Sequence, residues 1–134
     1  MTPSQAPTSR DALVLVVDDD DALRSIVKRA LEGVQVAVVT SKGAVEALDV
    51  IATRPIKVVL TDITMPDMDG WQLCSLVHAR YPELILGIMT GWGGSEPLRL
   101  VAHGVSFVVP KPFNVHELQA QVLALLKPTE PLVS

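Results

Sequence analysis

The sequence predicts an α/β fold: a doubly wound sheet of five parallel strands with helices on both faces. Five short runs of the chain are rich in Val, Ile and Leu and alternate little with polar residues, which is typical of strands buried on both faces. Segments with apolar residues at helical spacing lie between these runs. Because strands that alternate with helices form parallel sheets, the pattern indicates five consecutive βα units.

The expected strands are residues 12–17, 34–39, 56–60, 84–89 and 105–109. Right-handed crossovers restrict how such units can be connected. The arrangement that this favours is the flavodoxin-like one, with strand order 2-1-3-4-5.

Each of the first three expected helices carries an apolar stripe at helical spacing. The residues that share one face are Leu23, Ile26, Val27, Ala30 and Leu31 in the first, Val45, Leu48, Ile51 and Ala52 in the second, and, less cleanly, Leu73, Leu76, Val77 and Arg80 in the third. The fourth helix is expected to be short and to end near His103, because two glycines and a proline fall close to its start. The fifth begins after Asn114, which can cap it, and Glu117 stands at capping-box spacing.

Length and composition predict a single domain over residues 11–127, with disordered ends at 1–10 and 128–134. The net charge of −4 and the absence of a basic stripe argue against a nucleic-acid partner. No apolar run approaches the roughly 18 residues of a membrane span. The single cysteine, Cys74, excludes an intrachain disulfide and is expected to be a small buried residue; it fits a cytoplasmic location. The histidines His78, His103 and His116 are expected at the surface.

Polar side chains follow four of the five expected strands, at the point where each strand ends. Asp18 and Asp19 follow the first, Asp62 the third, Thr90 the fourth and Lys111 the fifth. The carboxyl ends of parallel strands lie at one edge of the sheet, where ligands bind in such folds. Three clustered carboxylates repel one another and raise the pKa of at least one of them. A divalent cation relieves this, and Mg²⁺ suits carboxylates combined with water and phosphate oxygens.

Lys111 and Thr90 then remain as donors for an anion beside the metal. A carboxylate, a cation, an ammonium and a hydroxyl that converge are the groups that phosphoryl transfer requires. Asp62 is the expected nucleophile, and its product would be an acyl phosphate.

Four motifs occur in order along residues 13–126: VLVVDDD at 14–20, DITMPDMDG at 62–70, Thr90-Gly91, and KPF at 111–113. With these motifs the chain resembles the CheY-like receiver domains of response regulators in two-component signalling. The resemblance implies that Asp62 is the phosphoacceptor and that Thr90 and Lys111 bind the phosphoryl group. It also implies a cis peptide at Lys111-Pro112.

The resemblance further implies that Asp18 and Asp19 hold Mg²⁺ together with Asp62 and the backbone carbonyl of Thr64. The phosphodonor would be a phosphohistidine on a histidine kinase or a histidine phosphotransfer protein. Such a domain is a signalling phosphoacceptor rather than an enzyme, and it assists only its own phosphorylation and dephosphorylation.

One departure from the family concerns the aromatic residue that often stands three positions before the lysine. Here that position is Val108, and strand alternation directs the neighbouring Phe107 to the other face. The usual aromatic output switch is therefore not expected.

Three functions remain at this point. The first is a single-domain response regulator that acts on a partner protein through the helix 4–strand 5–helix 5 face. The second is a non-phosphorylated pseudo-receiver that serves as an interaction module, which Val108 favours and the complete set of polar residues disfavours. The third is an aspartyl phosphatase, which is disfavoured because Thr64 occupies the position where such enzymes have a second aspartate.

Overall fold

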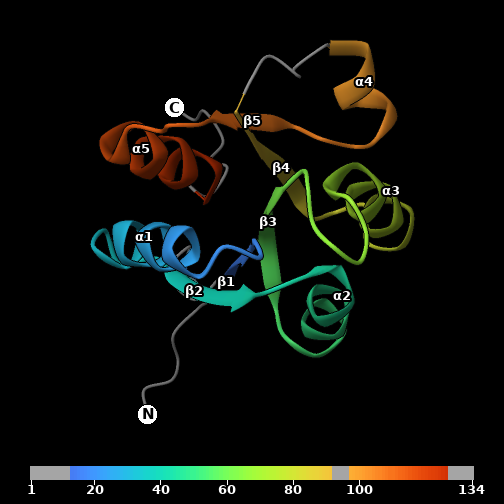
Figure 1. Ribbon diagram of the computed structural model, residues 1–134, viewed down its shortest axis with the longest axis horizontal. Coiled ribbons are helices and arrows are strands. Elements are labelled where there is room, and N and C mark those ends of the chain that lie inside the picture. The colour runs from blue at the N-terminus through green and yellow to red at the C-terminus, as the bar shows by residue number, and fades with distance from the viewer. Residues whose placement is uncertain (1–12, 92–96, 127–134) are drawn as a thin grey trace, which may run out of the picture.

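The computed structural model describes residues 13–91 and 97–126, which form one parallel sheet flanked by helices (Figure 1). The strands are β1 Leu13–Val17, β2 Ala37–Ser41, β3 Ile56–Asp62, β4 Ile85–Thr90 and β5 Phe107–Pro110. The helices are α1 Asp21–Glu32, α2 Ala44–Thr53, α3 Gly70–Arg80, α4 Pro97–Ala102 and α5 Val115–Leu126. The strand order β2-β1-β3-β4-β5 confirms the predicted topology.

The sheet separates two apolar cores. Figure 1 shows α1 and α5 on one face and α2 and α3 on the other, with α4 beyond the β5 edge. Alternate residues of β1 enter opposite cores: Val14 and Val16 pack towards α1 and α5, whereas Leu15 and Val17 pack towards α2 and α3. Burial on both faces explains the continuous apolar runs that predicted these strands.

Capping side chains fix where three helices begin. Asp20 caps α1 by accepting from the backbone N–H groups of Ala22 and Leu23, at 3.0 and 3.2 Å. Asp69 and Gln72 form a capping box at the start of α3. The predicted cap of α5 is confirmed, since Asn114 Oδ1 accepts from the N–H of Glu117 at 3.1 Å.

The second strand differs from its prediction. It begins at Ala37 rather than at residue 34, because the chain after α1 is still closing the helix end. Gln35 has a positive φ of 64°, and the N–H of Val36 donates to Leu31 O at 3.1 Å. The apolar residues Val34 and Val36 therefore cover the end of α1 instead of extending β2.

The predicted helical stripes are correct at most positions and wrong at a few. Ile26, Val45 and Leu76 are 49%, 66% and 45% exposed. On α2 the buried residues are Ala44, Ala47 and Ile51, so the helix is rotated from the predicted face. Alanines on the buried face allow a helix to approach the sheet closely. A prediction based on the larger apolar residues does not identify such a face.

The fifth strand directs its two neighbouring apolar side chains to opposite faces, as predicted. Phe107 is buried in the core beneath α1 and α5, where its ring covers Gly87 of β4 so closely that a Cβ there would collide with it. Val108 packs on the α2–α3 side and is only partly buried.

Among the described residues, no helix is long and apolar enough to cross a bilayer.

Candidate functional site

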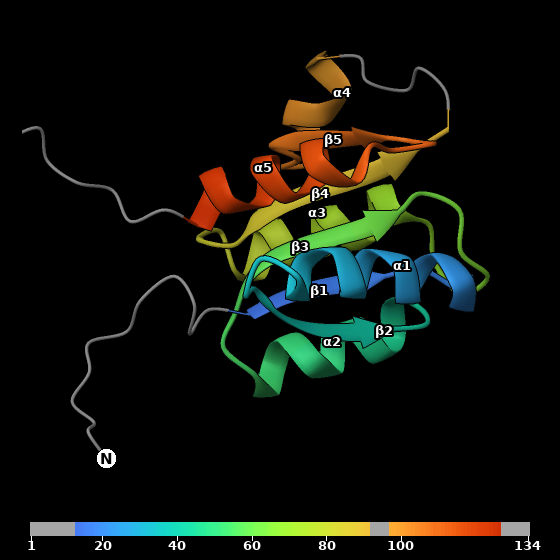
Figure 2. The same cartoon turned by 90° about the vertical axis from the view of Figure 1, so that its left-hand side faces the viewer.

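The carboxyl ends of the strands lie at one edge of the sheet, as the parallel arrows of β2, β3 and β4 show in Figure 2. Asp18 and Asp19 directly follow β1, and Asp62 is the last residue of β3. One carboxylate oxygen from each of these residues lies within 4.8 Å of the other two. The fold therefore brings together the three carboxylates that the sequence predicted.

Lys111 and Thr90 reach the same edge from β5 and β4. The Lys111 Nζ donates to Asp62 Oδ1 at 3.0 Å and lies 3.8 Å from Asp18 Oδ2. The backbone N–H of Lys111 donates to the carbonyl of Thr90 at 2.8 Å, which holds the two residues side by side. The peptide between Lys111 and Pro112 is cis, as expected.

Asp18 is the most constrained of the carboxylates, because its side chain is only 1% exposed. Burial raises its pKa above the usual value, and the charges of Asp62 and Asp19 raise it further. A hydrogen bond from the N–H of Asp20 and the charge of Lys111 act in the opposite direction. None of the described residues donates a hydrogen bond to its buried Oδ2. An oxygen of this kind, next to two further carboxylates, fits a hard divalent cation such as Mg²⁺.

The backbone around Asp18 is fixed by a residue that the sequence analysis did not single out. Arg24, on the first turns of α1, donates from Nη1 to the carbonyl oxygen of Asp18 at 2.7 Å. Its second terminal nitrogen pairs with Asp21. The motif gave no signal for this contact, because the arginine lies outside it.

Asp62 opens onto a cavity of about 390 Å³. Its Oδ1 accepts from the N–H of Ile63 at 2.9 Å as well as from Lys111. The cavity is lined by Asp62, Ile63, Thr64, Met65, Asp69, Trp71, Met89, Thr90, Gly91 and Arg99. Thr64 is thus placed beside the acceptor, and its predicted role as a carbonyl ligand stays a prediction. A larger groove of about 820 Å³ over α2 lacks these phosphoryl-transfer residues.

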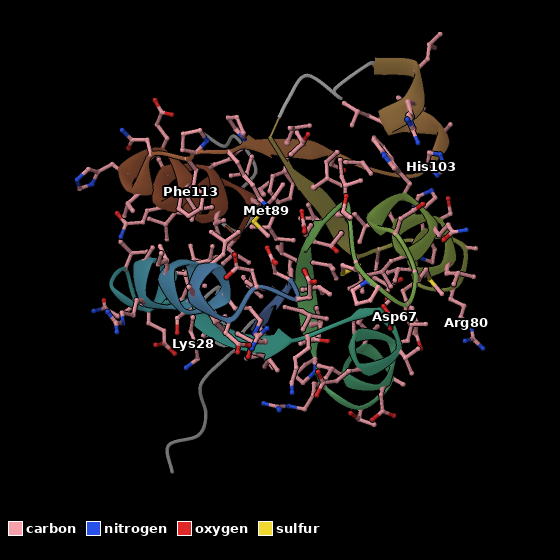
Figure 3. All side chains as sticks on the ribbon, viewed as in Figure 1. Lys28, Asp67, Arg80, Met89, His103 and Phe113 are labelled. Atoms are coloured by element: carbon pink, nitrogen blue, oxygen red, sulfur yellow. The ribbon has the colours of Figure 1, made fainter. Side chains whose placement is uncertain are left out.

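An aromatic and cationic cluster forms the wall of the cavity on the side of α3 and α4. The guanidinium carbon of Arg99 lies 4.3 Å from the centroid of the Trp71 ring. The His103 ring is tilted against Trp71 at 5.2 Å, and its Nδ1 is 2.6 Å from Ser75 Oγ. His103 is therefore only partly exposed, and Figure 3 places it between α3 and α4. His78 and His116 are exposed, as predicted.

Cys74 is fully buried on α3, which confirms its predicted packing role. Burial raises the pKa of its thiol to about 12. A thiol held neutral in this way is a poor nucleophile, so Cys74 takes no part in the chemistry of the site.

Residues 14–123 match the model of the response regulator receiver domain family. Among curated relatives, a response regulator MprA of Mycobacterium sp. (strain KMS) is 35% identical over 88% of this chain and 52% of its own length. The DNA-binding transcriptional regulator NtrC of Escherichia coli (strain K12) is also 35% identical, over 82% of this chain and 24% of its own. The chain thus spans about half, or less, of the length of these relatives.

Solved structures agree with this. A CheY-like response regulator receiver domain protein of Methanospirillum hungatei superposes with a TM-score of 0.80 and 28% identity, over 86% of this chain and 93% of that one. The chemotaxis response regulator CheY4 of Vibrio cholerae gives a TM-score of 0.78 and 26% identity, over 85% and 98%. The family match, the relatives and the fold agree: the chain belongs to the receiver domains of two-component response regulators.

Proposed function

We propose that this domain accepts a phosphoryl group on Asp62 from the phosphohistidine of a histidine kinase or a histidine phosphotransfer protein, with Mg²⁺ bound beside it. The observation that carries the proposal is the contact of Lys111 Nζ with Asp62 Oδ1 at 3.0 Å, next to the clustered carboxylates of Asp18 and Asp19. It makes Asp62 the one carboxylate of the cluster that combines the lysine contact with an opening onto the cavity.

In the proposed transfer, a carboxylate oxygen of Asp62 forms a bond to phosphorus. The phosphorus–nitrogen bond to the donor imidazole breaks, and the imidazole keeps the electron pair. Lys111 neutralises charge on the phosphoryl oxygens, and Thr90, at the end of β4, would donate from its hydroxyl to another of these oxygens. Receiver domains of this kind are signalling phosphoacceptors rather than enzymes.

Mg²⁺ would be held by Asp18, Asp19 and Asp62 with the backbone carbonyl of Thr64. When bound, it would offset the repulsion among the carboxylates and polarise the phosphoryl group. The buried Oδ2 of Asp18, which accepts no hydrogen bond from the described part of the chain, supports this assignment.

The output proposed for the domain is a partner protein that docks on the α4–β5–α5 face. Leu98 and Val101 of α4 are 86% and 75% exposed, and Leu123 of α5 is 41% exposed. Apolar side chains exposed on neighbouring elements favour a protein partner over a nucleic acid, and the net charge of −4 agrees with that. Action without a further domain, a cytoplasmic location and the boundaries 11–127 stay predictions.

The alternative is a pseudo-receiver that is never phosphorylated. The specific observation in its favour is Val108, which replaces the aromatic side chain expected on β5. The alternative leaves the intact contact between Lys111 and Asp62 without a role, so we rank it second.

Beryllofluoride, which mimics a phosphoryl group on a carboxylate, tests the proposal. With Mg²⁺ it should shift the amide resonances of Asp62, Thr90 and Lys111 in ¹⁵N-labelled protein, and an Asp62→Asn variant should show no such shift. Phosphorylation by a purified histidine kinase, followed by mass spectrometry, would then locate the acyl phosphate. A wild-type spectrum that stays identical to that of Asp62→Asn would leave the pseudo-receiver as the answer.

A further inference from the structure

Arg99 stands on the wall of the cavity into which Asp62 opens, and among the described residues of that wall it is the only cation. The other charged residues of the wall are the carboxylates Asp62 and Asp69. Asp69 also caps α3, so its charge is fixed in place by the N–H of Gln72. An anion that enters this cavity therefore meets two carboxylates and a single guanidinium.

Trp71 holds that guanidinium in position. The Trp71 side chain is buried and forms a rigid surface on which Arg99 rests at 4.3 Å, a distance typical of a cation–π contact. The Trp71 ring also contacts the His103 ring, which is itself held by a hydrogen bond with Ser75. An exposed arginine would otherwise sample many rotamers, so the indole and α4 together restrict where its charge lies.

Lys111 alone is not sufficient to offset the negative charge of the pocket. It already faces two carboxylates, at 3.0 Å from Asp62 and 3.8 Å from Asp18. Much of its charge is therefore balanced before a donor arrives. A second cation, Arg99 on the cavity wall, lowers the barrier to the approach of an anion, since a site lined by charge raises or lowers association rates by orders of magnitude.

We propose that Arg99 is a second anion-binding residue of the acceptor pocket, which attracts the phosphoryl group of the incoming donor, and that Trp71 is its positioning residue. The inference rests on the proposed transfer to Asp62 and adds a residue to it. For a small acyl-phosphate donor, the Asp62 oxygen bonds to phosphorus, the phosphorus–oxygen bond to the acyl group breaks, and the carboxylate leaves with the electron pair.

The test compares two donors that differ in charge, acetyl phosphate as a dianion and phosphoramidate as a monoanion. With Mg²⁺ present, Arg99→Gln should lower the second-order rate of phosphorylation by acetyl phosphate on the order of threefold to tenfold, and the rate with phosphoramidate by clearly less. The difference should shrink at about 0.5 M salt, where screening is strong. Arg99→Lys should recover part of the rate.

Arg80→Gln is the matched control. This residue is also an exposed arginine, at the last position of α3, and Figure 3 shows it pointing away from the sheet. It should leave both rates unchanged. Trp71→Leu, which keeps an apolar side chain at the site, should reproduce the Arg99→Gln effect in weaker form. Equal rates for wild type and Arg99→Gln, or equal losses with both donors, would overturn the proposal.

A second measurement separates this proposal from the transfer on which it rests. The chain contains two tryptophans, so a Trp92→Phe background leaves Trp71 as the only indole. Titration with inorganic phosphate should change the Trp71 emission saturably, and Arg99→Gln in that background should abolish the change. Failure of wild type to form an acyl phosphate would refute the transfer alone, whereas an emission that ignores phosphate would refute the role of Arg99.

Discussion

The side chain of Asp18 is buried at the end of β1 although it lies beside two further carboxylates. Its burial raises its pKa, which means that the folded protein holds a proton there more tightly than the unfolded chain does. The unfavourable effect on stability is therefore fully present at pH values above the folded pKa. It is relieved as the pH falls through that value towards 3.8, the ordinary value.

This linkage predicts the effect of Asp18→Asn. With all divalent cations chelated at pH 7, the variant should have a free energy of unfolding about 1 kcal/mol higher than that of wild type, because one buried charge is removed. Urea unfolding measured as a function of pH checks this. The advantage should disappear as the pH falls towards 4, and a variant that is less stable than wild type at pH 7 would contradict the argument.

The motifs located the residues of the site that lie at strand ends, and the reason is geometric. Asp18, Asp62, Thr90 and Lys111 each end or follow a strand of one parallel sheet, so their positions in the sequence fix where they lie in the fold. Arg99 was not found, because it lies outside the four motifs, on the six-residue helix α4. Its contact with the Trp71 ring depends on the rotation of α4 about its axis, which sequence spacing alone does not determine.

At the scale of elements, β4 and β5 are joined by the close contact of Phe107 with Gly87. A methyl group at position 87 would collide with the ring. Gly87→Ala should therefore lower the free energy of unfolding by about 1–3 kcal/mol, the usual range for overpacking a core. Gly91→Ala is the control, because a Cβ there meets no atom of the described residues within 4 Å. Chemical denaturation should give a lower free energy of unfolding for Gly87→Ala than for Gly91→Ala. Equal stabilities would show that β5 shifts to accommodate the added methyl group.

Helix α2 begins without a capping side chain of its own, because its N-cap residue is Gly43. Asp67, from the loop after β3, accepts instead from the N–H groups of Ala44 and Val45, at 3.2 and 3.0 Å. These bonds lower the pKa of the Asp67 carboxyl. The stability that they provide is thus present above the ordinary value of 3.8 and is lost as the pH falls through the folded pKa.

Asp67→Ala should accordingly lower the melting temperature at pH 7, and its difference from wild type should vanish in acid. Asp49→Ala, which removes an exposed carboxylate from the same helix, should change the melting temperature little. Thermal scans between pH 7 and pH 3 check both variants. If the two variants melted alike at pH 7, the contact between the loop and α2 would have no measurable effect on stability.

The sequence predicted the elements better than it predicted which way the helices face. Continuous apolar runs identify strands of a doubly covered sheet, since both faces need apolar side chains. A helix faces the sheet with only part of its surface, and alanines compete with larger residues for that part. On α2 the buried Ala44 and Ala47 displaced Val45 from the predicted stripe. Which face of a helix is buried depends on how closely the helix packs on the sheet, and this distance cannot be read from composition.

At the scale of the whole molecule, the proposed cation site and the core act on the same folding equilibrium. β1 and β3 are adjacent strands inside the sheet, with β2 beside β1 and β4 beside β3. Asp18 and Asp19 follow β1 and Asp62 ends β3, so the carboxylates that repel one another lie at the ends of these two strands. Any cation that binds there stabilises the folded state only, because the unfolded chain separates these residues. Metal affinity can therefore be measured as stability of the entire domain.

Mg²⁺ should raise the free energy of unfolding of the wild type by about 2.7 kcal/mol when its concentration is a hundred times the dissociation constant. Asp18→Asn should lose most of this gain, because it removes a carboxylate from the cluster. It should therefore be the more stable protein in chelator and the less stable one in saturating Mg²⁺. Asp49→Asn, which changes an exposed carboxylate on α2, should keep the full gain.

This crossing of the two stabilities is specific to a metal ligand. A residue that merely packs would shift stability by the same amount in both conditions. A reference sample in which KCl replaces MgCl₂ at equal ionic strength separates general screening from specific binding of Mg²⁺. Denaturant unfolding of wild type, Asp18→Asn and Asp49→Asn with chelator, with KCl and with MgCl₂ measures the free energy of unfolding in each condition. If Mg²⁺ stabilised wild type and Asp18→Asn equally, Asp18 would not be a metal ligand. The proposed role of Mg²⁺ in phosphorylation at Asp62 would then lose its support.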